Sequence, residues 1–128
     1  MRARRCPLGR RGGVMPDCLF CKIVARSIPA TLVDETTTLL AFRDINPQAP
    51  THLLVIPKQH IASLAEIDAS TAPLMGEATL FANRLAQQQG FADRGYRLVV
   101  NCGAEAGQTV WHLHLHLLGG RSFQWPPG

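Results

Sequence analysis

Residues 110–118, Val110-Trp111-His112-Leu113-His114-Leu115-His116-Leu117-Leu118, alternate imidazoles with large apolar side chains. Successive side chains of a β-strand point to opposite faces of the sheet, so this alternation predicts a strand with one buried face. The leucines form ordinary core, whereas the three histidines would stand in a row, roughly 6 to 7 Å apart. Such a row indicates a functional site, because each ring has two nitrogens that need partners and titrates near neutral pH.

Two kinds of chemistry use a row of imidazoles. Neutral histidine is a common metal ligand, and its ring nitrogen is also a nucleophile toward phosphorus. Cys18 and Cys21 have the spacing of a zinc half-site, which keeps the metal alternative open. A redox role for this C-x-x-C pair is not favoured, because no thioredoxin-like βαβ pattern surrounds it.

The composition indicates one compact domain. The 128-residue chain is 46% hydrophobic and 17% charged, which allows a core of its own. No apolar run reaches the roughly 18 residues that cross a bilayer, so we expect a soluble protein with no membrane partner. Four cysteines in a chain with this much core indicate a reducing compartment rather than a disulfide framework, and we expect a cytoplasmic protein.

The net charge of +4 is concentrated in residues 1–14, which hold five arginines and no acidic residue. The rest of the chain has eight basic and nine acidic residues, a net charge of −1, and gives no reason to expect a nucleic-acid partner. We expect residues 1–14 to be a disordered basic leader and residues 15–128 to form the domain. Met15 is an alternative start, and an organellar presequence is the open alternative for the leader.

The order of the expected elements predicts an α+β fold with a mainly antiparallel sheet. A short helix is expected from residue 18 to about 26, with Asp17 as its N-cap. A long helix is expected over residues 69–89, ended by Gly90. The expected strands cover residues 31–34, 38–43, 52–57 and 96–102 and the histidine run.

The pattern H-x-H-x-H-x-x with apolar x is also the signature of the histidine triad (HIT) superfamily. The resemblance extends over residues 17–128, and the chain is similar to the branch of histidine triad nucleotide-binding proteins that act as purine nucleoside phosphoramidases. The matching blocks are Asp17–Ile23, Ala41–His52, Leu54–Lys58, Gly95–Arg97, Asn101, Gly107–Val110, Gly119–Arg121 and Trp125–Gly128.

This resemblance implies a fold, an assembly and a reaction. The fold would be HIT-like, a five-stranded sheet with one long and one short helix, extended across a homodimer. The reaction would be hydrolysis of the bond between a purine nucleoside monophosphate and an amine, with adenosine or guanosine monophosphate (AMP or GMP) as product. It would pass through a covalent nucleotidyl-histidine, because a neutral imidazole nitrogen is a good nucleophile and leaves an intermediate that water can attack. No cofactor is required for this chemistry.

The same resemblance implies catalytic roles. His114 would be the nucleophile, and His116 would bind the phosphate oxygens. His112 would orient its neighbour, and His52 would complete a relay from an adjacent strand. Thr109, at a position where relatives often have serine, would face the leaving group.

The resemblance also implies how the nucleotide is held. Asp44 would accept the ribose hydroxyls, although a purely structural Asx turn is an alternative role for it. Phe42, Ile45 and the stem of Arg43 would form walls around the base. The other expected nucleotide contacts are Asn101, Gly107, Gln108, Thr109, His114, His116 and, reaching across the dimer from the tail, Trp125.

Some members of the family bind zinc through a cysteine pair and two histidines that correspond to His52 and His112. The resemblance therefore implies these histidines either as relay members or, with Cys18 and Cys21, as ligands of a structural zinc ion. His60 is interpreted as a surface or capping residue outside the site. Two other functions stay open: a nucleotide-binding regulatory protein without catalysis, and a zinc-dependent hydrolase that uses the three histidines directly.

Overall fold

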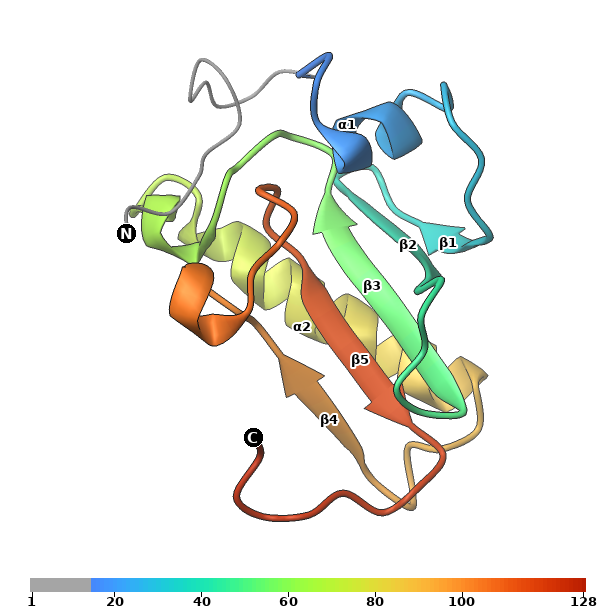
Figure 1. The fold of residues 1–128 in the computed structure, drawn as a ribbon. Coiled ribbons are helices and arrows are strands. Elements are labelled where there is room, and N and C mark those ends of the chain that lie inside the picture. The colour runs from blue at the N-terminus through green and yellow to red at the C-terminus, as the bar shows by residue number, and fades with distance from the viewer. Residues whose placement is uncertain (1–14) are drawn as a thin grey trace.

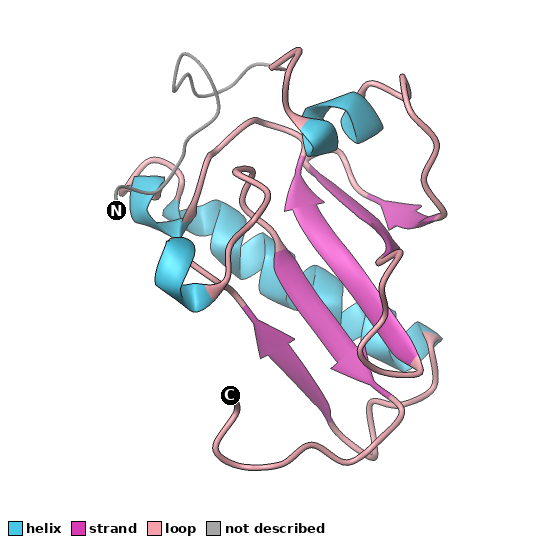
Figure 2. Ribbon diagram, viewed as in Figure 1, coloured by secondary structure: helices cyan, strands magenta, loops and turns pink. Residues whose placement is uncertain are grey.

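The computed structural model describes residues 15–128, so the predicted leader lies outside the described residues. The helices are α1 (Leu19–Val24) and α2 (Ala72–Gln88), with 3-10 turns η1 (Leu64–Glu66) and η2 (Ala104–Ala106). The strands are β1 (Leu32–Glu35), β2 (Leu39–Arg43), β3 (Thr51–Pro57), β4 (Tyr96–Val99) and β5 (Leu115–Gly119). Within the described residues they form one antiparallel sheet in the order β1-β2-β3-β5-β4 (Figures 1 and 2). The predicted α+β class and five-stranded antiparallel sheet are confirmed.

Each face of the sheet has its own core, because side chains alternate along the strands. On one face Leu53 and Val55 of β3 pack with Leu117 of β5 against α2, which lies across that face in Figure 1. On the opposite face Leu54 and Ile56 of β3 pack with buried side chains of α1. The long helix therefore covers one face, and the short helix leaves part of the other face for a site.

The pairing of β3 with β5 brings two histidines to the α1 face. Leu54 of β3 pairs with His116 of β5, and His52 lies two residues before Leu54 on the same face of the strand. Leu115 and Leu117 are buried in the core under α2, as the alternation predicts. The half of the histidine run that enters the sheet therefore has the predicted orientation.

The other half of the run differs from the prediction of a single strand. The strand begins only at Leu115, so His112 and His114 precede it. The Leu113 N–H donates to the carbonyl of Ile61 at 2.7 Å, which ties this segment to the loop after β3 instead of to a neighbouring strand. The prediction that residues 110–114 belong to the strand is wrong.

Both helices begin at residues other than those predicted. α1 is capped by Cys18, whose Sγ lies 3.4 Å from the Cys21 N–H, and not by Asp17. α2 begins at Ala72, because the Asp68 carboxylate accepts N–H bonds from residues 70 and 71 and forms a turn there. Gly90, with φ +83°, follows its C-terminus as predicted. None of the helices in residues 15–128 has the length and apolarity to cross a membrane.

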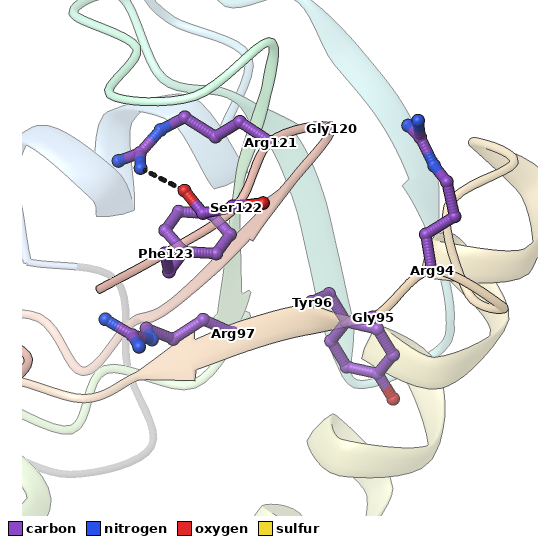
Figure 3. A pocket seen from close by; sticks show the side chains of 8 residues that line it. All are labelled: Arg94, Gly95, Tyr96, Arg97, Gly120, Arg121, Ser122 and Phe123. Atoms are coloured by element: carbon purple, nitrogen blue, oxygen red, sulfur yellow. Dashed lines mark hydrogen bonds between the residues drawn. The ribbon is translucent and has the colours of Figure 1, made fainter. Parts of the chain in front are cut away.

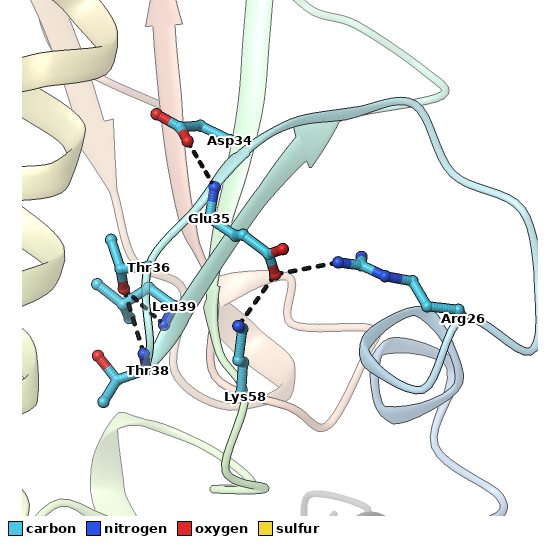
Figure 4. A network of polar contacts seen from close by, with 7 residues as sticks. All are labelled: Arg26, Asp34, Glu35, Thr36, Thr38, Leu39 and Lys58. Atoms are coloured by element: carbon cyan, nitrogen blue, oxygen red, sulfur yellow. Dashed lines mark hydrogen bonds and ion pairs between the residues drawn. The ribbon is translucent and has the colours of Figure 1, made fainter.

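A polar network joins the end of α1 to the edge of the sheet (Figure 4). The Glu35 carboxylate lies 3.0 Å from the Arg26 guanidinium and 2.9 Å from the Lys58 ammonium. The Thr36 hydroxyl accepts the N–H bonds of Thr38 and Leu39 and closes the turn between β1 and β2. These groups are partly exposed, so solvent screens both ion pairs and they add little to stability.

Candidate active site

A cavity of about 460 Å³ opens on the α1 face of the sheet. Its walls are apolar side chains of α1 and β2, and its polar groups include the imidazoles of His52, His114 and His116. An apolar cavity of this size with a few convergent polar groups is typical of a small-molecule site. The structure therefore brings together three of the four histidines for which the resemblance implies catalytic roles.

His114 has a defined tautomer. Its Nδ1 lies 2.7 Å from the backbone carbonyl oxygen of His112, and a carbonyl only accepts, so Nδ1 carries the proton. Burial lowers the pKa of His114 below its ordinary value, against the opposite effect of that hydrogen bond. The ring is therefore neutral near pH 7, with the lone pair on Nε2. The edge-to-face contact of its ring with Phe20, at 5.1 Å between centroids, holds its orientation.

His52 and His116 form a hydrogen-bonded pair with defined protons. The Gln48 N–H donates to Nδ1 of His52 at 3.0 Å, so the proton of neutral His52 is on Nε2. That Nε2 lies 2.9 Å from Nδ1 of His116, which accepts and leaves the His116 proton on its own Nε2. Burial lowers the pKa of His116 to about 4 and also lowers the pKa of His52, although the Asp44 carboxylate opposes the second shift. His116 is therefore a neutral hydrogen-bond donor.

Asp44 makes the Asx turn considered for it and also lines the cavity. Its Oδ1 accepts the Asn46 N–H at 2.8 Å, which is an Asx turn. Its Oδ2 lies 3.4 Å from Nε2 of His52, and the residue lines the cavity. A turn that holds one carboxylate oxygen leaves the other directed toward the imidazoles.

The other residues expected around the nucleotide divide into two sets. Phe42, Arg43, Ile45 and Thr109 line the cavity. Asn101, Gly107, Gln108 and Trp125 do not line it. Ile45 is fully exposed, so its side chain is accessible to a ligand in the cavity.

The loop before the histidines uses its amides internally. The Gly107 and Gln108 N–H groups donate to the carbonyls of Ala104 and Gly103, and φ of +92° at Gly107 makes this turn possible. The buried Gln108 side chain bonds Gly103, Ala62 and Val110. Contrary to expectation, these two residues hold the loop and do not present donors to the cavity. Trp125 is 82% exposed, away from the cavity of its own chain.

His112 belongs to a second, buried cluster. Its Nε2–H donates to the carbonyl of Pro57 at 2.8 Å, so the lone pair of neutral His112 is on Nδ1. That Nδ1 lies 3.4 Å from Sγ of Cys18 and 3.5 Å from Sγ of Cys21. His112 therefore orients His114 through its backbone carbonyl, while its side chain faces the two thiols.

The fourth member of this cluster is His60, not His52. Nδ1 of His60 lies 3.2 Å from Sγ of Cys21, and one ligand atom from each of the four residues lies within 4.8 Å of the others. The interpretation of His60 as a surface residue is wrong, because it is completely buried. A usable signal was present: the cysteine half-site needs two more ligands, and His60 was the histidine without an assigned role.

Burial disfavours the charged forms of the side chains in the cysteine and histidine cluster. Burial raises the pKa of Cys21 to about 11 and lowers the pKa of His112 to about 4, so thiol and imidazole are both neutral. Nε2 of His60 has no hydrogen-bond partner among the described residues. Two thiols and two imidazoles with lone pairs directed inward are the donor set of a tetrahedral zinc site.

The comparisons with known proteins agree with this geometry. Residues 25–123 match the HIT domain family. An uncharacterised HIT-like protein of Synechococcus elongatus is 54% identical over 112 residues, which cover 88% of this chain and 97% of that protein. A solved HIT family hydrolase of Legionella pneumophila is 54% identical, with a TM-score of 0.86 over 88% of this chain and 100% of the other. A solved histidine triad nucleotide-binding protein of Candida albicans is 32% identical, with a TM-score of 0.72 over 86% and 83% of the two chains. This chain therefore belongs to the HIT family.

Proposed function

We propose that this protein is a hydrolase that cleaves purine nucleoside phosphoramidates into a nucleoside monophosphate and an amine. The observation that carries this proposal is the pairing of a neutral His114, with its lone pair on Nε2, and a neutral donor, His116, in one nucleotide-sized cavity. The descriptions of the Legionella relative as a hydrolase and of the Candida relative as nucleotide-binding support it.

The first step would form a bond between Nε2 of His114 and the substrate phosphorus. The bond from phosphorus to the amine nitrogen breaks, and the amine leaves with its electron pair and takes up a proton from solvent, which the second step returns to solvent. Thr109 lines the cavity, and its hydroxyl would donate a hydrogen bond to that nitrogen. The Nε2–H of His116 would stabilise negative charge on a phosphate oxygen, which is the largest type of contribution in such sites.

The second step would release the nucleotide. Water attacks phosphorus and loses a proton, and the bond to Nε2 of His114 breaks so that its electron pair returns to the ring. The carbonyl of His112 keeps the proton on Nδ1 throughout, which fixes the ring for both steps. Splitting the hydrolysis into two displacements allows the imidazole to perform the difficult one.

The ribose and base would bind along the loop after β2. The Asp44 carboxylate lines the cavity and accepts hydrogen bonds, which suits a pair of ribose hydroxyls. Phe42 and the exposed Ile45 would enclose the base between apolar surfaces. This placement supports a purine because a large aromatic ring gains more from apolar walls than a smaller one.

The donor set of the buried cluster fits a structural zinc ion, which we propose is held by Cys18, Cys21, His60 and His112. When bound, the ion would cross-link α1 to the segment that presents His114, with no open coordination position. His112 Nε2–H on the Pro57 carbonyl is the kind of outer hydrogen bond that orients a ligand histidine. Catalysis would require no cofactor.

We also propose that the protein is a homodimer that pairs β4 with its copy. β1 and β4 are the edges of the sheet in residues 15–128. β1 has an irregular register between Leu32 and Asp34, which protects an edge, whereas β4 is regular. The exposed Trp125 is then available to the partner's cavity. Sedimentation equilibrium should give twice the mass of the chain, and a monomer would contradict the assembly.

Turnover of adenosine 5′-phosphoramidate tests the proposed function. We expect chromatography to detect stoichiometric release of AMP, with full activity after dialysis against a chelator. Tight nucleotide binding without release would favour the regulatory alternative and contradict hydrolysis. Loss of turnover on chelation while circular dichroism stays unchanged would favour a zinc-dependent hydrolase.

A further inference from the structure

Arg121 follows the glycine pair at the end of β5 and lies outside the catalytic cavity. Its Nε and Nη2 both donate to the backbone carbonyl of Gln48, at 3.1 and 3.0 Å. Its Nη1 donates to the carbonyl of Ser122 at 2.9 Å, the bond drawn in Figure 3. Two donors of a rigid guanidinium on one carbonyl fix its direction as well as its distance, which a lysine cannot do.

The Arg121 side chain is itself held in place. Its guanidinium carbon lies 4.2 Å from the ring centroid of Phe123, and that of Arg97 lies 5.1 Å from the same centroid. Figure 3 shows the ring between the two guanidinium groups. Gly120 has φ +95°, and a Cβ there would lie 2.9 Å from Cβ of Pro50. The turn thus packs close enough to the 44–50 loop for Arg121 to reach Gln48.

Gln48 links this arginine to the catalytic histidines. Its carbonyl accepts from Arg121, and its N–H donates to Nδ1 of His52. Residues 44–50 form no helix or strand, so no backbone ladder fixes Gln48. The hydrogen bonds from Arg121 to the Gln48 carbonyl therefore help to keep the Gln48 N–H bonded to His52.

The Gln48 amide at Nδ1 of His52, together with the Asp44 carboxylate 3.4 Å from its Nε2, sets where two protons lie. With Nδ1 of His52 accepting, Nε2–H of His52 donates to Nδ1 of His116 and leaves His116 with a donor on Nε2. If the Gln48 amide moved away, His52 could carry its proton on Nδ1 and accept from His116. The lone pair of His116 would then be on Nε2, where it repels a phosphate oxygen instead of donating to it.

We propose that Arg121 is a positioning residue that keeps the Gln48 amide on His52 and thereby selects the tautomer in which His116 donates to the substrate phosphate. This inference rests on the proposed function and deepens it. Arg121 has no carboxylate partner among the described residues, and it is exposed. Replacing it therefore leaves no unpaired buried charge, and a structural effect can be separated from an effect on the protons.

The test compares the wild type with R121Q, R121K and R94Q by 15N NMR of the histidine rings, which distinguishes protonated from unprotonated ring nitrogens. Arg94 lines the same surface as Arg121 but does not contact Gln48, so it provides the matched control. We expect the wild type and R94Q to have a protonated Nε2 on His52 and on His116. R121Q should show averaged signals from both tautomers, and R121K should be intermediate.

The kinetic part of the test uses adenosine 5′-phosphoramidate. R121Q should lower kcat about tenfold, a typical effect of an outer hydrogen-bond partner, with little change in KM. R121K should recover part of kcat, and R94Q should match the wild type. If R121Q fails to fold, R121K carries the same comparison, because it keeps the charge and loses the paired donors.

Wild-type tautomers in both Arg121 variants would overturn the inference, whatever happens to the thermal midpoint. The NMR measurement needs no substrate, so it decides the inference even if phosphoramidates are not hydrolysed. Unchanged tautomers in an active enzyme would remove the inference and leave the proposed function in place. Mixed tautomers in R121Q, with no phosphoramidate turnover by the wild type, would support the inference about Arg121 and contradict the proposed function.

Discussion

Two groups of histidines lie close together in this protein, but their surroundings differ. His112 and His60 are completely buried beside two thiols, whereas His114 and His116 line a cavity. His112 and His114 come from the same alternating run, yet the break before β5 sends their side chains to different environments. One hydrogen bond joins the groups, from Nδ1 of His114 to the carbonyl of His112. The buried cluster thus supports the proposed nucleophile, and the cavity would be the place of the proposed chemistry.

This comparison predicts that the cavity can lose its chemistry while the fold is kept. H114A should lower phosphoramidate turnover by at least about 10³-fold, because no other unprotonated nitrogen takes its place. The thermal midpoint and nucleotide binding should stay close to those of the wild type. Steady-state kinetics and calorimetry measure both. Activity above a tenth of the wild-type value would contradict the assignment of His114.

Replacing a cysteine of the buried cluster should have the opposite effect. It should remove the metal site and lower stability, while the molecules that stay folded keep their activity. C21A should abolish zinc binding, measured as metal per chain by mass spectrometry, and lower the free energy of unfolding by about 3 kcal/mol or more. C102A is the matched control, because Cys102 is an exposed thiol outside the cluster. Equal metal content in C21A and C102A would refute the zinc assignment.

The ribose contact should give a smaller effect, seen mainly in substrate binding. D44N keeps an oxygen for the Asn46 turn but removes the charge, so KM should rise about tenfold, the equivalent of roughly 1.4 kcal/mol. A 2′-deoxy substrate should reduce this difference between the wild type and D44N. D34N, at the edge strand β1, provides the control. The same loss with both substrates would remove the ribose from the role of Asp44.

The pH dependence should show the smallest effect on catalysis. Burial holds the pKa of His116 at about 4 and the pKa of His114 below the ordinary 6.5, so the acidic fall of kcat should lie below pH 6.5. The unfolded chain takes up these protons near pH 6.5, before the folded one does. The contribution of these neutral histidines to the free energy of unfolding is therefore fully present above pH 6.5 and is lost as pH falls toward 4. Urea midpoints at pH 7.5 and pH 5 test the sign, and a more stable protein at pH 5 would contradict it.

The sequence predicted the parts of the site that depend on local periodicity. A period of two predicted that His116 and the neighbouring leucines lie on opposite faces, because strand geometry fixes alternation. In the structure His116 lies on the α1 face, and Leu115 and Leu117 lie beneath α2. The sequence also offered the Asx turn of Asp44, because that turn forms between residues of the same loop.

The parts that the sequence missed depend on contacts between distant segments. The strand starts at Leu115 because Leu113 bonds Ile61, and nothing in the alternation signals that bond. His60 is buried because the loop after β3 passes over Cys21, so its role depends on tertiary packing. Gln108 was an expected nucleotide contact, but its side chain forms hydrogen bonds with three nearby backbone groups.

Trapping the covalent intermediate tests the central claim most directly. The protein is mixed with adenosine 5′-phosphoramidate, quenched within the first turnover, digested and analysed by mass spectrometry. Nε2 of His114, neutral and lining the cavity, should carry one adenylyl group, and H114A should carry none. An adenylyl group on His116 or His52, or rapid turnover with no modified histidine at any time, would contradict the account.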